Sequence, residues 1–442
     1  MMIFGKAFKN LMMEMAACAA IYLFSFLLSR GGMHGLSAVL LILLAVIIYI
    51  LQYKRTDSLV DMKGLFSLAW IGGQGLACLQ LSKLQTDWHV MTWFAFYLAY
   101  FGFSVGYVET GTVPQHGEIV RKQKQADRLF LCACGLAAVS WICFFLEYFV
   151  VGFIPLFSEE PHAYSYFHVS GVHYFTISCI LVPAITVLWH QTKETAFMKQ
   201  YVMLAAANLT AVAIPVLCVS RFQLLFAVGF AVVIYILTNR KLNWKILILL
   251  LLLLIPAYIG LTVARNHDVA YLNGIFEMKN SRMPIFITQP YIYVANNFEN
   301  FNCLVGQMTG HTYGIRMLFP FFALTGLKFV FPQLTASPIY ITKPELTTLT
   351  MFYDAYYDFG AAGVLLFSAV LGFAAKKIRN RTAGCGNPVI CLFYGQMAIY
   401  LGLSFFTTWF SNPTTWFWLV LTACMYLFVG FDKKKGDQTD GR

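Results

Sequence analysis

Charged side chains are scarce in this chain. Only 12% of its 442 residues are Asp, Glu, Lys or Arg, whereas an average soluble protein carries roughly 25%. Apolar residues make up 59% of the sequence, so the polar side chains could not cover the surface of a soluble domain of this size. The composition excludes intrinsic disorder and predicts a membrane protein.

Several common catalytic and ligand-binding motifs are also missing. The chain contains no Gly-rich phosphate loop, no His-Glu-x-x-His metal motif, no Gly-x-Ser-x-Gly elbow and no dinucleotide fingerprint. Its 11 cysteines include no Cys-x-x-Cys pair, and nearly all lie in apolar stretches, where Cys packs as a small hydrophobe. Cys132 and Cys134 have no third ligand nearby in the sequence. We therefore expect no metal, no cofactor and no disulfide framework.

Long apolar runs are the dominant feature of the sequence. A bilayer core of roughly 30 Å needs about 20 apolar residues in a helix. We predict an all-α, polytopic fold with about twelve such spans, at 11–28, 34–53, 64–84, 88–108, 129–150, 169–189, 200–219, 222–238, 246–263, 350–375, 387–405 and 414–431. The first span follows Lys6 and Lys9 and is interpreted as an uncleaved anchor.

The basic residues predict the orientation of these spans. With the N-terminus in the cytoplasm, 22 of the 31 Lys and Arg residues fall in cytoplasmic segments and nine fall outside, as the positive-inside rule requires. Both termini are then cytoplasmic. The net charge of +11 is explained by topology, and no nucleic-acid partner is expected.

One connection is much longer than the others. We expect the chain to divide into N-terminal membrane helices at 1–263, a large extracytoplasmic loop at 264–349, three C-terminal membrane helices at 350–431 and a basic cytoplasmic tail at 432–442.

Long loops in compact proteins are usually functional. We expect two interrupted helical segments in this loop, Ile285–Phe301 and Ile315–Phe331, to lie at the membrane interface as a lid or groove. A purely structural cap is the alternative. The expected breaks in these segments are Pro284, Pro290, Asn296, Asn297, Pro320 and Gly326.

Charges at the outer ends of spans are the first candidates for a functional site, because each is costly in a membrane unless it is paired or used. Arg221 lies where one span ends and the next begins, Arg265 ends the ninth span, and Arg282 and Arg316 lie in the large loop. An arginine at such a position can bind a lipid phosphate bidentately. It can also simply extend toward the headgroups.

Two acids open the tenth span. Asp354 and Asp358 are four residues apart and share a helix face. Two like charges this close raise each other's pKa unless a cation lies nearby, which is typical of functional sites. The alternative is that they only complement the dipole at the start of a helix. The turn Gly310–Gly314 before Arg316 adds a titratable group, His311.

Three stretches together resemble the Wzy-type oligosaccharide repeat-unit polymerases of bacterial O-antigen and capsule synthesis. The first is the Ser220-Arg221 step. The second is Tyr291–Asn302 together with the Gly310–Gly314 turn. The third is Thr347–Lys377, in which Asp358-Phe359-Gly360 is followed by small residues. The resemblance covers about a third of the chain by sequence and the rest by topology.

This resemblance implies a metal-independent, GT-C-like glycosyltransferase of the bacterial cytoplasmic membrane, active on the outer face. Such polymerases transfer a growing glycan from undecaprenyl pyrophosphate to a sugar hydroxyl of a new lipid-linked repeat unit. Their further partners would be membrane lipids, a chain-length regulator and a flippase. Arginines would neutralise the leaving pyrophosphate, and we expect Arg221, Arg265, Arg282 and Arg316 in this role. The general base would be His311, Asp354, Asp358 or Glu299.

The sequence departs from the family in one respect, and other functions stay open. Some members carry Arg-x10-Gly in external loops, but the eleventh residues after Arg265, Arg282 and Arg316 are Phe276, Tyr293 and Leu327. The alternatives are an O-antigen ligase, a non-enzymatic flippase or transporter of lipid-linked glycans, and an exopolysaccharide acyltransferase.

Overall fold

The computed structural model describes most of the chain. The described residues are 2–108, 119–159, 163–239, 245, 248, 252, 269–335, 338–384 and 386–431. Apart from residues 248 and 252, the predicted ninth span at 246–263 therefore lies outside the described residues, as does Arg265. The predicted cytoplasmic tail lies outside them as well.

The described part of the chain is helical and contains no strand, with one isolated β-bridge between Ser82 and Met278. The N-terminal helices are α1 (Met2–Arg30), α2 (His34–Thr56), α3 (Met62–Ser67), the π-helix η1 (Leu68–Gly72), α4 (Gly73–Cys78), α5 (Val90–Tyr107), α6 (Gln123–Val151), α7 (Val172–Thr176), α8 (Val182–Thr192), α9 (Met198–Leu217) and α10 (Arg221–Asn239). The later helices are α12 (Val269–Phe276), α13 (Ile285–Gln307), α14 (Ile315–Leu324), α15 (Leu327–Val330), α16 (Tyr353–Ala383), α17 (Ile390–Gly402) and α18 (Pro413–Gly430). Short 3-10 turns are η2 (Pro155–Phe157), η3 (Ala163–Ser165), η4 (Ile177–Leu181), η5 (Pro332–Leu334) and η6 (Trp409–Ser411).

Nine of the described helices, counting α7, η4 and α8 as one, are long and apolar enough to cross a membrane. This confirms the prediction of a polytopic all-α membrane protein, but the number twelve stays a prediction. The third predicted span is the run Met62–Cys78, which a π-helical turn divides. The eleventh is α17, whose 13 residues are too few to cross a bilayer core alone.

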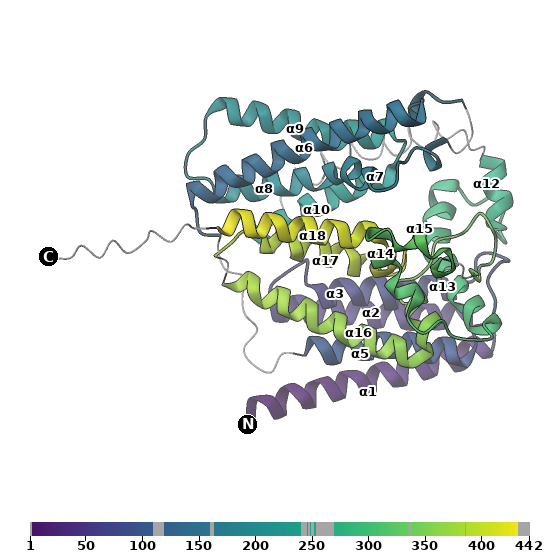
Figure 1. Cartoon of the computed structure of the whole chain (residues 1–442). Helices are drawn as coiled ribbons and strands as arrows, with labels where there is room; N and C mark the ends of the chain where they lie inside the picture. The colour runs from purple at the N-terminus through teal and green to yellow at the C-terminus, as the bar shows by residue number, and fades with distance from the viewer. Residues whose placement is uncertain are drawn as a thin grey trace.

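The loops gather at two opposite ends of the helix bundle (Figure 1). At one end, Gln125 donates a hydrogen bond to the carbonyl of Gly386 (2.9 Å), and Arg128 donates to the carbonyl of Val429 (3.1 Å). The N-terminus lies at this end in Figure 1, and the large-loop helices α12 to α15 gather at the opposite end. We refer to the latter as the loop end.

The large loop contains helices where helices were expected, but their interruptions differ from the prediction. Pro284 precedes α13 and Gly326 separates α14 from α15, as predicted. The prediction was wrong for the other four breaks, because Pro290, Asn296, Asn297 and Pro320 lie inside helices. The two asparagines are stabilised by tertiary contacts that outweigh their low helix propensity. Asn297 donates to the carbonyl of Phe405 (2.8 Å), and the hydroxyl of Thr342 donates to Asn296 (2.8 Å).

Close packing against α5 positions α16, the helix that carries both candidate acids. A β-carbon at Gly106 would lie 2.1 Å from the carbonyl oxygen of Ala369, and one at Gly372 would lie 2.1 Å from the carbonyl oxygen of Phe103. Gly102 is equally constrained, since its β-carbon would lie 2.6 Å from the carbonyl oxygen of Leu365. Small residues spaced by four allow membrane helices to approach this closely.

Replacing Gly106 with alanine should destabilise the protein by about 1–3 kcal/mol, because the added methyl group overlaps backbone atoms of α16. Gly135→Ala on α6 is the matched control, since a β-carbon there meets no atom within 4 Å. Thermal unfolding midpoints in detergent measure the difference. Equal midpoints for the two variants would contradict this account of α5–α16 packing.

Candidate functional site

Asp358 joins the large loop to α16. Its carboxylate is fully buried and accepts hydrogen bonds from the backbone N–H of Met317 (2.8 Å), the backbone N–H of Arg316 (3.3 Å) and the hydroxyl of Thr312. The first N–H groups of a helix lack partners within the helix, and a carboxylate there also interacts favourably with the helix dipole. Asp358 therefore stabilises the start of α14, and three donors already occupy it.

Asp354 forms an ion pair with Arg316. The Nε of Arg316 lies 2.5 Å from Oδ1 of Asp354, and the guanidinium lies 4.6 Å from the centre of the Tyr357 ring. Burial alone would lower the pKa of Arg316, but the Asp354 carboxylate more than offsets this and the pKa is raised. Within the described residues, the Nη groups of Arg316 donate no hydrogen bond. Asp354 thus fixes the direction of the guanidinium while four N–H donors stay available.

A tyrosine pair forms one side of this ion pair. The guanidinium carbon of Arg316 lies 5.7 Å from the Tyr353 ring. The Tyr353 hydroxyl in turn donates to the carbonyl of Tyr340 (3.0 Å) and accepts from its N–H (2.9 Å). The segment before α16 is therefore fastened to the helix beside Arg316.

His311 lies next to the same residues and is exposed. Its Nδ1 is 3.1 Å from the carbonyl oxygen of Tyr357. A carbonyl only accepts hydrogen bonds, so Nδ1 carries the proton and the neutral ring keeps a lone pair on Nε2. Tyr357 thus contacts His311 through its carbonyl and Arg316 through its ring.

Gly360 makes this approach of His311 possible. Its φ of 62° and ψ of −151° interrupt α16, in a region of backbone conformation that essentially only glycine occupies. A β-carbon at this position would lie 3.2 Å from Cε1 of His311 and 3.4 Å from Nε2. The Asp358-Phe359-Gly360 pattern therefore has a physical basis, with an acid that caps α14 and a glycine that admits the histidine.

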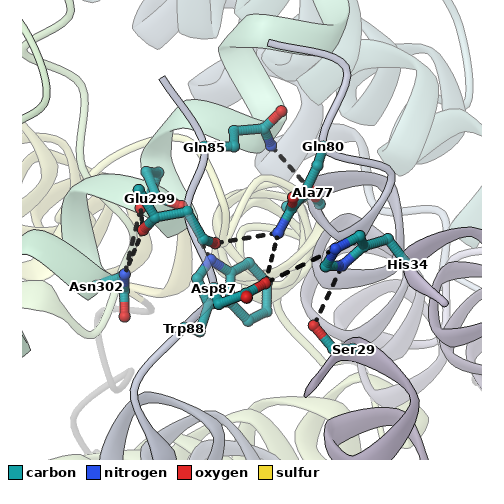
Figure 2. A network of polar contacts seen from close by, with 10 residues as sticks. Ser29, His34, Ala77, Gln80, Gln85, Asp87, Trp88, Glu299 and Asn302 are labelled. Carbon is teal, nitrogen blue, oxygen red and sulfur yellow. Dashed lines mark hydrogen bonds and ion pairs between the residues drawn. The ribbon is translucent and has the colours of Figure 1, made fainter. Parts of the chain in front are cut away.

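Glu299 belongs to a separate, buried network (Figure 2). Its carboxylate accepts hydrogen bonds from the hydroxyl of Thr86 (2.5 Å), the indole of Trp88 (3.0 Å) and the amide of Asn302 (3.2 Å). Burial raises the pKa of Glu299, although these hydrogen bonds lower it in part. Only 1% of the residue is exposed, so its carboxylate has no direct access to a substrate hydroxyl. It fastens α13 to the segment before α5.

Arg221 and Arg282 lie on different elements from the His311–Arg316–Asp354 group. Arg221 begins α10 and is 4% exposed. The ring of its neighbour Phe222 contacts Tyr293 of α13 (6.1 Å between ring centres), so Arg221 lies at the loop end. Arg282 is exposed between α12 and α13. Arg265 lies outside the described residues. A single site built from all four arginines therefore stays a prediction.

The structure thus brings together four of the predicted residues, His311, Arg316, Asp354 and Asp358, and we call them the loop-end cluster. It adds residues that sequence reasoning did not select, Thr312, Tyr340 and Gly360. Only Gly360 carried a usable signal, as a glycine directly after Asp-Phe at the start of a span. Among the described residues, no three His, Cys, Asp or Glu side chains lie close enough together to hold a metal ion.

No family model, curated protein or solved structure matches this chain.

Gly360→Ala should distort the loop-end cluster, because alanine is strained by about 1–3 kcal/mol in this conformation and its methyl group contacts His311. Gly310→Ala is the control in the same loop, since a β-carbon there meets no atom within 4 Å. We expect a lower unfolding midpoint and faster proteolysis near residue 311 for Gly360→Ala only. Identical digestion patterns for both variants and the parent would contradict the role assigned to Gly360.

Proposed function

We propose that the chain is a polysaccharide polymerase of the bacterial cytoplasmic membrane. It would transfer a growing glycan from polyprenyl pyrophosphate to a hydroxyl of a new lipid-linked repeat unit. The observation that carries this proposal is the contact of one residue, Tyr357, with both Arg316 and His311. A cation for a leaving pyrophosphate and a base for an acceptor hydroxyl therefore lie side by side.

The geometry of Arg316 supports the donor half of the reaction. Asp354 occupies Nε and leaves the planar fork of Nη donors for a ligand, which matches the bidentate geometry of a phosphate. The side chain is 14% exposed, so it is largely desolvated yet reachable. Fixed donors in such surroundings stabilise developing negative charge strongly, because they need no reorganisation during the reaction.

The geometry of His311 supports the acceptor half. Its exposed position and the hydrogen bond at Nδ1 leave Nε2 as the proton acceptor. In the proposed step, the acceptor oxygen bonds to the anomeric carbon while the bond from that carbon to the pyrophosphate oxygen breaks. The hydroxyl proton moves to Nε2, and the electron pair leaves on the pyrophosphate, where Arg316 balances the charge. Asp358 and Asp354 act as positioning residues.

The membrane setting is also part of the proposal. The loop end would face away from the cytoplasm, since the basic residues concentrate toward the other end. Lipid-linked repeat units would then reach the loop-end cluster from the outer leaflet. The partners would be undecaprenyl-pyrophosphate-linked oligosaccharides, a flippase that delivers them and a chain-length regulator.

Glycan ladders on gels test this function in a strain that lacks the chain. Reintroducing the parent protein should restore long ladders, whereas Arg316→Gln should leave a single repeat unit on the acceptor. Loss of one such charge-stabilising group costs about 10²–10³ in rate. The double variant Arg316→Gln/Asp354→Asn should behave in the same way without leaving a buried carboxylate unpaired.

Lys279→Gln is the control, because Lys279 is an exposed basic residue of the same loop outside the cluster. It should keep full ladders. Full ladders from well-expressed Arg316→Gln protein would contradict the site. In the strain without the chain, complete loss of attached glycan would indicate a ligase, and repeat units trapped on the cytoplasmic side would indicate a flippase.

A further inference from the structure

A groove of about 600 Å³ opens at the loop end, and its lining contains no residue of the loop-end cluster. Four helices and one loop residue line the groove. The lining residues are Arg30 of α1, the loop residue His89 just before α5, Val90, Met91 and Phe94 of α5, Val305 of α13 and Tyr356 of α16. Tyr356 is two residues after Asp354, so it faces a different side of α16. The groove and the cluster therefore flank the same turn of one helix.

Arg30 and His89 form the polar end of the groove. Arg30 ends α1 and is exposed. Its only recorded interaction within the described residues is with the Phe26 ring, at 5.6 Å. His89 is also exposed, and no hydrogen bond of its imidazole is found in the described part of the chain. A guanidinium beside an imidazole N–H offers several donors to a phosphate group.

The remainder of the groove is apolar and faces outward. Val90, Met91 and Phe94 are 59%, 47% and 49% exposed. Their spacing by three and four places them on one face of α5, which is a candidate membrane span. In a membrane, such a face contacts lipid chains. A ligand in the groove would therefore meet a charged group at one end and an apolar surface along the rest of its length.

Residues of the network in Figure 2 are next to both polar residues of the groove. Ser29, the neighbour of Arg30, lies 3.4 Å from His34. Asn302 accepts a hydrogen bond from the backbone N–H of His89 (2.9 Å). Asp87 is the nearest acid in the sequence, but its carboxylate is directed toward His34 (3.8 Å) and Gln80 (3.2 Å). Arg30 and His89 thus adjoin residues of this network, in which the Asp87 carboxylate already contacts His34 and Gln80.

We infer that this groove binds a membrane lipid through its phosphate, with Arg30 and His89 at the headgroup and Val90, Met91 and Phe94 along the first part of the chain. The continuity of the apolar face with a membrane span argues for a lipid and against a free anion. The inference concerns binding only and does not depend on the proposed transfer reaction. If that reaction holds, the groove supplies a second lipid site across α16 from Arg316.

Photolabelling of the full chain in detergent tests the inference. The probe is farnesyl phosphate that carries a benzophenone near the phosphate end of its chain, and farnesol with the same label is the uncharged comparison. We expect labelling by farnesyl phosphate to map to residues near Val90–Phe94. Arg30→Gln should weaken apparent affinity about tenfold, which corresponds to about 1.4 kcal/mol. Lys83→Gln, an exposed basic residue outside the groove, should leave it unchanged.

Each other outcome overturns the inference. Equal labelling by farnesol and by farnesyl phosphate would show that the phosphate is not recognised. The same conclusion would follow if farnesyl phosphate labelled Arg30→Gln as strongly as the parent protein while the unfolding midpoint of the variant was unchanged. Competition by inorganic phosphate at the same concentration as farnesyl phosphate would show a free-anion site. Phe94→Ala gives an independent check, because this substitution should weaken the binding of farnesyl phosphate while the protein stays folded. None of these results depends on glycan ladders, so the failure of this inference and of the proposed function are distinguishable.

Discussion

Two carboxylates on one helix face organise the loop end of this protein. Asp354 and Asp358 are buried four residues apart, an arrangement that would be strongly unfavourable without compensation. Each has its own partner, since Asp354 pairs with Arg316 and Asp358 caps the start of α14. The same contacts anchor a long loop to a membrane helix, so the charges that need compensation are also the ones that position Arg316 and His311.

The rest of the bundle supports that arrangement through α16. Glycine contacts bring α5 to within backbone contact of α16, and the buried Glu299 network ties α13 to the segment before α5. One turn of α16 consequently faces the loop-end cluster on one side and the Arg30 groove on another. In the two proposals made above, each surface binds a phosphate group that is attached to a lipid chain.

The sequence predicted the helical membrane fold, because long apolar runs leave few alternatives. It also placed Arg316, Asp354, Asp358 and His311 among the candidates. It could not show that Glu299 is buried, since its partners Thr86 and Trp88 lie more than 200 residues away. The expected helix breaks at Asn296 and Asn297 failed for the same reason, because distant acceptors and donors satisfy both side chains. Tertiary contacts of this kind leave no local pattern.

The account depends most on the side of the membrane that the loop end faces. Labelling with a membrane-impermeant maleimide decides this directly, with Gln307→Cys at the end of α13 compared with Glu194→Cys at the opposite end, both at exposed positions. After subtraction of the labelling of the parent protein, the account predicts that intact spheroplasts label Gln307→Cys and that Glu194→Cys reacts only after permeabilisation. The reverse pattern would place Arg316 and His311 in the cytoplasm and contradict the account.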